Sequence, residues 1–432
     1  MSTKRLIPAV LLAVALAACG SSKSTTTTTD EPVTLTFWTW VPNIQKTVDL
    51  YHQKFPKITV KVVNAGQSAD EYTKLQTSVK AGSGAPDVAQ IEYFALPQFA
   101  LAKQVVNLND YGAASLESKY GKSAWAQVNV NGGVYGYPQD TGPMVMFYRQ
   151  DVLASLNIQP PTTWQEFEAA AVKIHAANPK NYISTIDPGD AGGVDSMLWQ
   201  AGSRPFKTVS PTEASVNLGD SGAGTWSALW SDLLSKKLVD PAPGWTNDWW
   251  QGMDSGKYAV WIAGAWAPGS ISSTIPDTNG KWRAAPMPQW KAGDNVTAEN
   301  GGSSDAVVTT SKNKAAAAAF AQWLNSDPAA AKSLNDNGLF PATTALLNDQ
   351  SFLDSPNAFF GGQQANKIFA DSSAHVATGW QYLPFQVYAN SVFKDTVGQP
   401  ISNGTDPAAG LKAWQQRIVD YGKQQGFQMT TN

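Results

Sequence analysis

Residues 33–40, Val33-Thr34-Leu35-Thr36-Phe37-Trp38-Thr39-Trp40, alternate apolar and polar side chains as a β-strand does. The segment that follows predicts a helix, because its apolar residues recur every three to four positions, at Ile44, Val48, Tyr51 and Phe55. A second strand is expected over 58–63, a helix over the segment that carries Tyr72 and Leu75, and a third strand over 87–92. Strands that alternate with helices predict parallel βαβ units, and so an α/β sheet covered by helices on both faces.

The same alternation continues through the rest of the chain. Thr163 and Glu166 form a capping box at the start of a helix, and Pro328 opens a helix that should end near Gly338. A chain of 432 residues exceeds what one compact core usually organises, so two lobes are expected. Ligands of open α/β sheets bind beyond the carboxyl ends of the strands, which is where Trp40, Glu92 and Tyr93 fall.

The composition excludes several classes of function. Apolar residues make up 43% and charged residues 15%, which is typical of a globular protein. The 31 basic and 34 acidic residues give no positive electrostatic field of the kind that attracts nucleic acid. The three histidines are far apart and lack metal-ligand spacing, so no metal is expected. The chain has no P-loop, no GxSxG elbow, no HExxH and no CxxC motif, so neither a cofactor nor a catalytic residue is expected.

The N-terminus predicts export and anchoring. Lys4 and Arg5 precede an apolar stretch that is too short to span a bilayer but fits a signal peptide. The stretch ends in LAACG, which resembles a lipobox, and it places the single cysteine, Cys19, at the position that would be lipidated. We therefore expect residues 1–18 to be a lipoprotein signal peptide and residues 19–31 to be a lipidated cysteine with a flexible polar tether. The protein would then sit on the outer face of the cell membrane, held there by its lipid alone.

Six segments in succession carry a family resemblance: FWTW, GSGAPDVAQIEYFALPQFA, GYPQDTGPMVMFYRQDVL, PPTTWQEF, GKYAVWIAGAWAPGSI and ENGGSSDAVVTT. This order resembles the extracellular solute-binding proteins of the maltose-binding type, which serve ABC importers of sugars. The resemblance implies a periplasmic-binding-protein-like fold of two α/β lobes, with a ligand cleft between them and three hinge crossings. The N-terminal lobe would comprise 32–141 and 301–341, and the C-terminal lobe 142–300 and 342–432. The crossings would lie near Gly142-Pro143, Asn300-Gly301 and Phe340-Pro341.

A sugar site needs flat aromatic rings for the C–H faces of the sugar and carboxylates or amides for its hydroxyls. By resemblance, Asp140 binds sugar hydroxyls, Trp266 stacks on a sugar ring, and Glu92 and Tyr93 form a polar and aromatic pair after the third strand. The remaining expected ligand contacts are Trp40, Trp245, Asn300 and Trp380, while Trp230, Trp261, Trp323 and Trp414 are interpreted as core residues.

The sequence thus predicts a monomeric, non-enzymatic lipoprotein that captures a carbohydrate and delivers it to the permease subunits of an ABC importer. The supply of stacking residues favours a di- or oligosaccharide. Two alternatives stay open at this stage. The same fold could bind a polyamine or another solute that is not a sugar, because aromatic rings and carboxylates suit that ligand too. An anchored glycoside hydrolase could use Asp140 and Glu92 as its pair of carboxyl groups.

Overall fold

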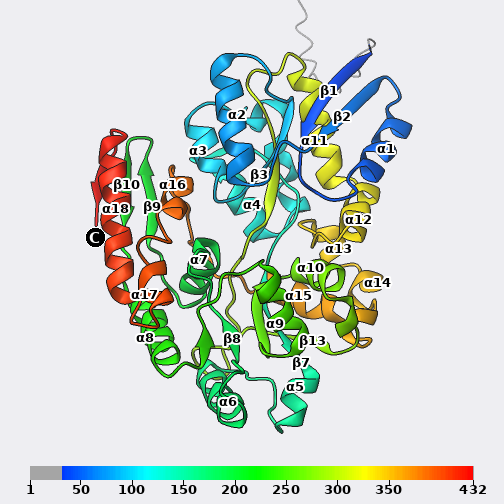
Figure 1. The fold of residues 1–432 in the computed structure, drawn as a ribbon. Coiled ribbons are helices and arrows are strands. Elements are labelled where there is room, and N and C mark those ends of the chain that lie inside the picture. The colour runs from blue at the N-terminus through cyan, green and yellow to red at the C-terminus, as the bar shows by residue number, and fades with distance from the viewer. Residues whose placement is uncertain (1–31, 432) are drawn as a thin grey trace, which may run out of the picture.

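The computed structural model describes residues 32–431, so the predicted signal peptide, Cys19 and the tether lie outside the described residues. Figure 1 shows two lobes, one above the other, each built from a sheet with helices around it. The two-lobed α/β fold predicted from the sequence is confirmed.

The N-terminal lobe contains a five-stranded sheet in the order β2-β1-β3-β14-β6. Its first three strands are parallel, and β14 runs antiparallel to β3 and β6. The strands are β1 (Val33–Trp38), β2 (Ile58–Val63), β3 (Val88–Glu92), β6 (Tyr137–Pro138) and β14 (Ser303–Val307), with a separate ribbon of β4 (Asn129–Val130) and β5 (Gly133–Val134). The helices are α1 (Gln45–Lys54), α2 (Ala69–Ala81), α3 (Leu96–Leu101), α4 (Lys122–Val128), α11 (Lys314–Ser326) and α12 (Pro328–Asp336), with 3₁₀ turns at Leu108–Tyr111 and Ala113–Lys119.

The C-terminal lobe is organised around β7 (Met144–Arg149), which pairs antiparallel with β12 (Val260–Gly264) and β13 (Trp282–Ala285). The smaller sheets are β8 (Ser184–Thr185) with β11 (Val239–Asp240), and β9 (Phe206–Ser210) with β10 (Glu213–Val216) and β15 (Gln428–Thr430). The larger helices are α5 (Gln150–Ser155), α6 (Trp164–Ala177), α7 (Ala191–Gln200), α8 (Ser221–Ser235), α9 (Asn247–Ser255), α10 (Ala267–Thr274), α15 (Ala365–Ala374) and α18 (Ala408–Gln424). Shorter turns are α13 (Thr344–Leu347), α14 (Gln350–Leu353), α16 (Gln386–Ser391), α17 (Gly398–Ser402) and the 3₁₀ turns Pro276–Thr278 and Ala358–Phe360.

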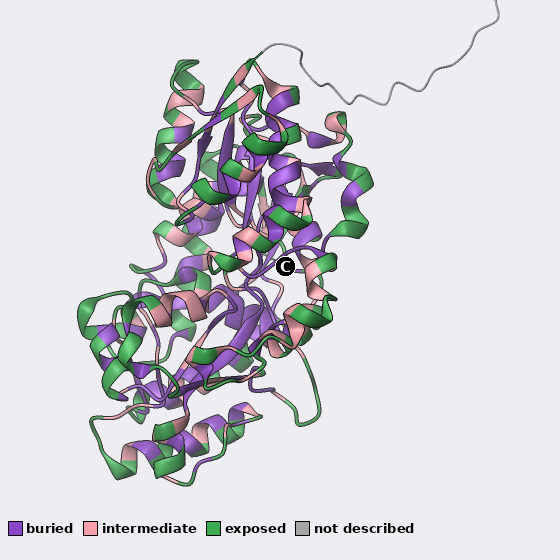
Figure 2. Cartoon of the chain, turned by 90° about the vertical axis from the view of Figure 1, so that its right-hand side faces the viewer, coloured by how far each residue is buried: buried purple, intermediate pink, exposed green. Residues whose placement is uncertain are grey.

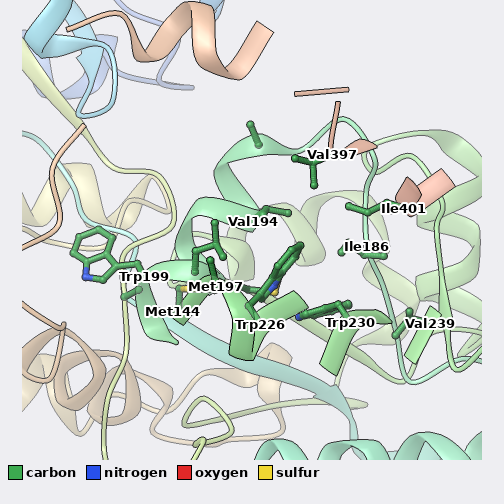
Figure 3. Packing of buried hydrophobic residues seen from close by; sticks show 14 of the residues in the cluster. Met144, Ile186, Val194, Met197, Trp199, Trp226, Trp230, Val239, Val397 and Ile401 are labelled. Carbon is green, nitrogen blue, oxygen red and sulfur yellow. The ribbon is translucent and has the colours of Figure 1, made fainter. Parts of the chain in front are cut away.

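Each lobe has its own hydrophobic core. One cluster of buried side chains draws on residues between Leu35 and Tyr137 and between Ala306 and Ala342, while two others draw almost wholly on residues between Met144 and Ala298 and beyond Phe360. Figure 2 shows the buried strands of both lobes enclosed by helices whose outer faces are exposed. Figure 3 shows Trp226 and Trp230 side by side in the core of the C-terminal lobe, where both are fully buried. Because each such ring removes about 150–250 Å² from water, these aromatic residues contribute much of the stability of the lobe.

The chain passes between the two cores three times, and the three connections lie against one another. The Asn300 N–H donates to the Gly142 carbonyl at 2.7 Å, and the Thr141 N–H donates to the Phe340 carbonyl at 3.0 Å. Phe340 packs with the C-terminal lobe and Ala342 with the N-terminal lobe, so the third connection is shared by both. These contacts fall where the sequence places its crossings; the exact lobe boundaries stay a prediction.

Candidate functional site

A pocket opens on the C-terminal lobe next to the connections, with about 680 Å³ of space between protein atoms, part of it open to solvent. Its wall is rich in indole rings, which come from α8, the loop after β11, the start of α9, and β12 with the residues that follow it. The tryptophans that line it are Trp230, Trp245, Trp249, Trp261 and Trp266.

Trp266 is held in one orientation by the second connection. Its indole N–H donates to the Asn300 carbonyl oxygen at 2.7 Å. Gly264 makes room for this bond, because a Cβ at that position would lie 2.4 Å from the indole nitrogen and 2.6 Å from the same carbonyl oxygen. A ring that is fixed before the ligand arrives loses little conformational entropy on binding.

Trp245 lies over Trp266 and is 56% exposed, an unusual exposure for so large an apolar side chain. The centroids of the two rings are 5.8 Å apart with an interplanar angle of 28°, and Trp261 stands nearly perpendicular to both. The backbone of Trp245 is in the left-handed region, with φ of 63°, a conformation that costs a residue with a Cβ about 1 kcal/mol or more. The adjacent loop is tied down because the Gly244 N–H donates to Asp187 Oδ2 at 2.8 Å.

Polar groups surround the indole rings on the side of α7. Asp190 caps this helix and accepts from the Gly193 N–H at 2.9 Å, and Asp187 lies in the preceding turn. Asn300 reaches α7 from the second connection, where its side-chain amide donates to Ser196 Oγ at 3.2 Å. Aspartate and asparagine oxygens beside flat rings supply the two kinds of contact that a sugar requires.

The N-terminal lobe presents a second aromatic and acidic group at the carboxyl end of its sheet. Trp40 follows β1 and meets Tyr72 edge-on, with centroids 6.4 Å apart. The Tyr72 hydroxyl donates to Glu92 Oε2 at 2.9 Å. Burial raises the pKa of Glu92, while its hydrogen bonds with the hydroxyls of Ser68 and Tyr72 work in the opposite direction.

Two buried carboxyl groups fasten the first two connections together. Asp140 Oδ1 accepts from the Ser303 N–H, and Glu299 Oε2 accepts from the Gly142 N–H, both at 2.8 Å. Burial raises the pKa of Asp140 and of Glu299 to about 7. Each connection therefore holds a backbone amide of the other through a carboxyl group that is out of contact with solvent.

The comparisons with known proteins agree with this architecture. Residues 38–331 match the family model of the bacterial extracellular solute-binding proteins. The chain belongs to this family. It is similar to the lactose-binding protein of Rhizobium radiobacter, with 27% identity over 85% of this chain and 86% of that protein.

Two solved structures resemble this solute-binding protein over almost its whole length. One is the ABC transporter associated binding protein of B. animalis subsp. lactis Bl-04 in complex with beta-1,6-galactobiose, at 38% identity and a TM-score of 0.83, covering 92% of this chain and 99% of that one. The other is the galacto-N-biose-/lacto-N-biose I-binding protein of Bifidobacterium longum in complex with lacto-N-biose, at 26% identity and a TM-score of 0.82, covering 93% and 100%.

Seven of the eight ligand-binding residues predicted from the sequence fall into three groups in the solute-binding protein. Trp245, Trp266 and Asn300 line one pocket, and Trp40 and Glu92 lie together on the other lobe. Asp140 and Tyr93 are buried under the connections, where the Tyr93 hydroxyl donates to the Asp140 carbonyl oxygen at 2.8 Å. Both side chains hydrogen-bond to backbone groups of the connections, and their contact with ligand stays a prediction.

Trp380 is packed in the core of the C-terminal lobe. It is 7% exposed and stacks on Trp199, with centroids 5.2 Å apart and an interplanar angle of 6°, and its contact with ligand stays a prediction. Trp261, interpreted as a core residue, lines the pocket, together with Trp249, which the sequence reasoning missed. Trp230, also interpreted as a core residue, is fully buried and lies at the same pocket wall. The only signal for Trp249 is its place in the first turn of a helix that follows the loop of Trp245.

Over residues 32–431, no helix is long and apolar enough to cross a membrane. The same part of the chain holds no group of three or more His, Cys, Asp or Glu side chains that could bind a metal ion.

Proposed function

We propose that this solute-binding protein captures a galactose-containing di- or oligosaccharide outside the cytoplasm and delivers it to the permease of an ABC importer, without chemical change. The observation that carries the proposal is the stacked pair of indole rings, Trp245 and Trp266, beside the oxygen acceptors Asp187, Asp190 and Asn300. Galactose suits such a platform, because its axial 4-hydroxyl leaves one continuous C–H face on the opposite side of the ring.

The charge of the pocket favours a neutral ligand over an anion. Among the described residues that line it, none is Lys, Arg or His, so a phosphate or carboxylate would have no counter-charge. The relatives support a sugar over other neutral solutes: lactose, beta-1,6-galactobiose and lacto-N-biose, named for three of them, all contain galactose. Lipidation of Cys19 would keep the protein near its importer, and this remains part of the proposal.

Calorimetric titration of the chain from Ser21 onward tests the proposal. The panel would hold beta-1,6-galactobiose, lactose, lacto-N-biose, maltose, arabino-oligosaccharides and spermidine. We expect micromolar or tighter binding of a galactoside, and no hydrolysis products by chromatography. Trp266→Ala should abolish that binding, while Trp290→Ala, at another half-buried tryptophan of the same lobe, should leave it intact. Binding of spermidine alone would refute the sugar assignment, and release of monosaccharides would refute a pure binding role.

A further inference from the structure

Ser196 of α7 contacts one of the residues that line the pocket of Trp245 and Trp266. The Asn300 side-chain nitrogen Nδ2 donates to Ser196 Oγ at 3.2 Å, and the Ser196 hydroxyl donates to the Gly192 carbonyl oxygen at 2.7 Å. Ser196 is 3% exposed and lies behind the wall to which Asn300 belongs. Figure 1 shows α7 near the level where the two lobes meet. A short chain of hydrogen bonds thus runs from the pocket into the first turn of α7.

The direction of this chain of hydrogen bonds is fixed at its inner end. A backbone carbonyl oxygen only accepts, so the proton of the Ser196 hydroxyl points to Gly192. The Ser196 oxygen then offers lone pairs alone, and the end of the Asn300 amide that faces it must be the donor, Nδ2. The other end, Oδ1, has no hydrogen-bond partner within residues 32–431, and because Asn300 lines the pocket, this oxygen is left to meet the ligand.

The backbone of Asn300 is held independently of Ser196. Its N–H donates to the Gly142 carbonyl oxygen, and its own carbonyl oxygen accepts from the Trp266 indole N–H, both at 2.7 Å. These two bonds do not orient the side-chain amide, whose two ends have nearly the same shape. In the part of the chain that the structure describes, the bond with Ser196 is the one hydrogen bond that distinguishes the two ends.

We propose that Ser196 is a positioning residue that makes Asn300 an acceptor toward the ligand, so that the sugar must present a hydroxyl proton there. The inference rests on the proposed function and deepens it, because it concerns which substituents of the sugar are accepted. A fluorine or an ether oxygen at this point would lose the hydrogen bond and place two acceptors face to face. Asp187 and Asp190 accept through either carboxylate oxygen, whereas Asn300 presents its acceptor only because Ser196 orients the amide.

Fluorinated sugars test this role, because fluorine is similar in size to a hydroxyl group and cannot donate. The ligands would be beta-1,6-galactobiose, lactose and lacto-N-biose, each with derivatives in which one hydroxyl is replaced by fluorine. Calorimetry would give the ratio of the affinities of parent and derivative for every hydroxyl. We expect the wild-type chain to prefer the parent about tenfold at the hydroxyl that meets Asn300.

Ser196→Ala frees the amide to turn Nδ2 toward the ligand, where it can donate to a hydroxyl oxygen or to fluorine. We expect this variant to lower the ratio at that one hydroxyl to about threefold or less. The ratios at hydroxyls that meet Asp187 and Asp190 should stay at their wild-type values, since neither carboxylate depends on Ser196.

Two further variants separate orientation of the amide from support of the fold, after thermal denaturation has shown that each is folded. Ser227→Ala removes another buried helix hydroxyl of the same lobe, which donates to the Gly224 carbonyl oxygen at 3.2 Å, and it should change no ratio. In Asn300→Asp both side-chain oxygens accept, so adding Ser196→Ala to this variant should no longer lower the ratio.

An unchanged ratio in Ser196→Ala would overturn the positioning role and leave the proposed function standing. An equal loss of affinity for parent and derivative would do the same, because it would mean that Ser196 only supports the pocket. Tolerance of fluorine at every hydroxyl by the wild-type chain would also overturn it. A wild-type chain that binds none of the three sugars would refute the proposed function, and this inference with it.

Discussion

The contact between the first two connections leaves no room for a side chain at Gly142. A Cβ there would lie 2.0 Å from the Asn300 carbonyl oxygen and 2.9 Å from its carbonyl carbon, both of which are backbone atoms. Ordinary contacts are about 3.5 Å, so Gly142→Ala must push the two connections apart by about 1 Å or more.

Two hydrogen bonds depend on that close approach: Asn300 N–H to the Gly142 carbonyl at 2.7 Å, and Gly142 N–H to Glu299 Oε2 at 2.8 Å. A neutral bond contributes about 1 kcal/mol and one to a charged group about 1.5–3 kcal/mol, and the buried partners would be left unpaired. We therefore expect Gly142→Ala to lower the free energy of unfolding by about 3–5 kcal/mol. Ligand affinity should fall as well, since Asn300 also holds the Trp266 ring.

Urea denaturation followed by circular dichroism measures the first effect, and calorimetry with the bound sugar measures the second. Gly224→Ala is the matched control: it lies inside α8 with no atom within 4 Å of the place that an added methyl group would take, so it should be neutral or stabilise by up to about 1 kcal/mol. If Gly142→Ala unfolds at the same urea concentration as the wild type, the close packing of the connections described above is incorrect.

Three further predictions concern buried charge. Glu71 is fully buried, both its side-chain oxygens are unpartnered among the described residues, and burial, then the charges of Asp305 and Glu92, raises its pKa to about 8. Glu71→Gln should therefore stabilise the protein by an amount that grows from pH 5 to 8.5. Urea denaturation that shows no growth of this advantage with pH would contradict the prediction. Burial also raises the pKa of Asp140, Glu299 and Asp305 to about 7, and their unfolded values are near 4. Wild-type stability should therefore fall as pH rises from about 4 to 7, with Glu71 extending the fall to about pH 8; a flat profile would exclude this. The buried Arg149 side chain donates to two carbonyls at the end of α9 and to one carboxylate. Arg149→Ala should therefore lower the free energy of unfolding by about 3–5 kcal/mol, measured by thermal denaturation. A loss below about 1 kcal/mol would show that these bonds contribute little to stability.

Local patterns were sufficient to predict the framework. The strand expected over 58–63 is β2, Ile58–Val63. Thr163 caps its helix as predicted, since the Glu166 N–H donates to Thr163 Oγ1 at 3.1 Å, while the Glu166 carboxylate accepts from the Thr162 N–H at 2.7 Å. The helix opened by Pro328 ends at Asp336, two residues short of the predicted glycine. These features depend on side-chain periodicity and on capping contacts between residues a few positions apart, and both can be read from the sequence alone.

The sequence by itself therefore determined the α/β class, the two lobes and the kinds of side chain that a sugar site requires. Only the tertiary structure decided which tryptophans are exposed and which are buried. Trp380 is buried because Trp199, far away in the chain, stacks on it, whereas Trp245 lies over Trp266 in the pocket and stays 56% exposed. Exposure depends on the partners that folding brings to a residue, and the sequence around a tryptophan does not contain those partners.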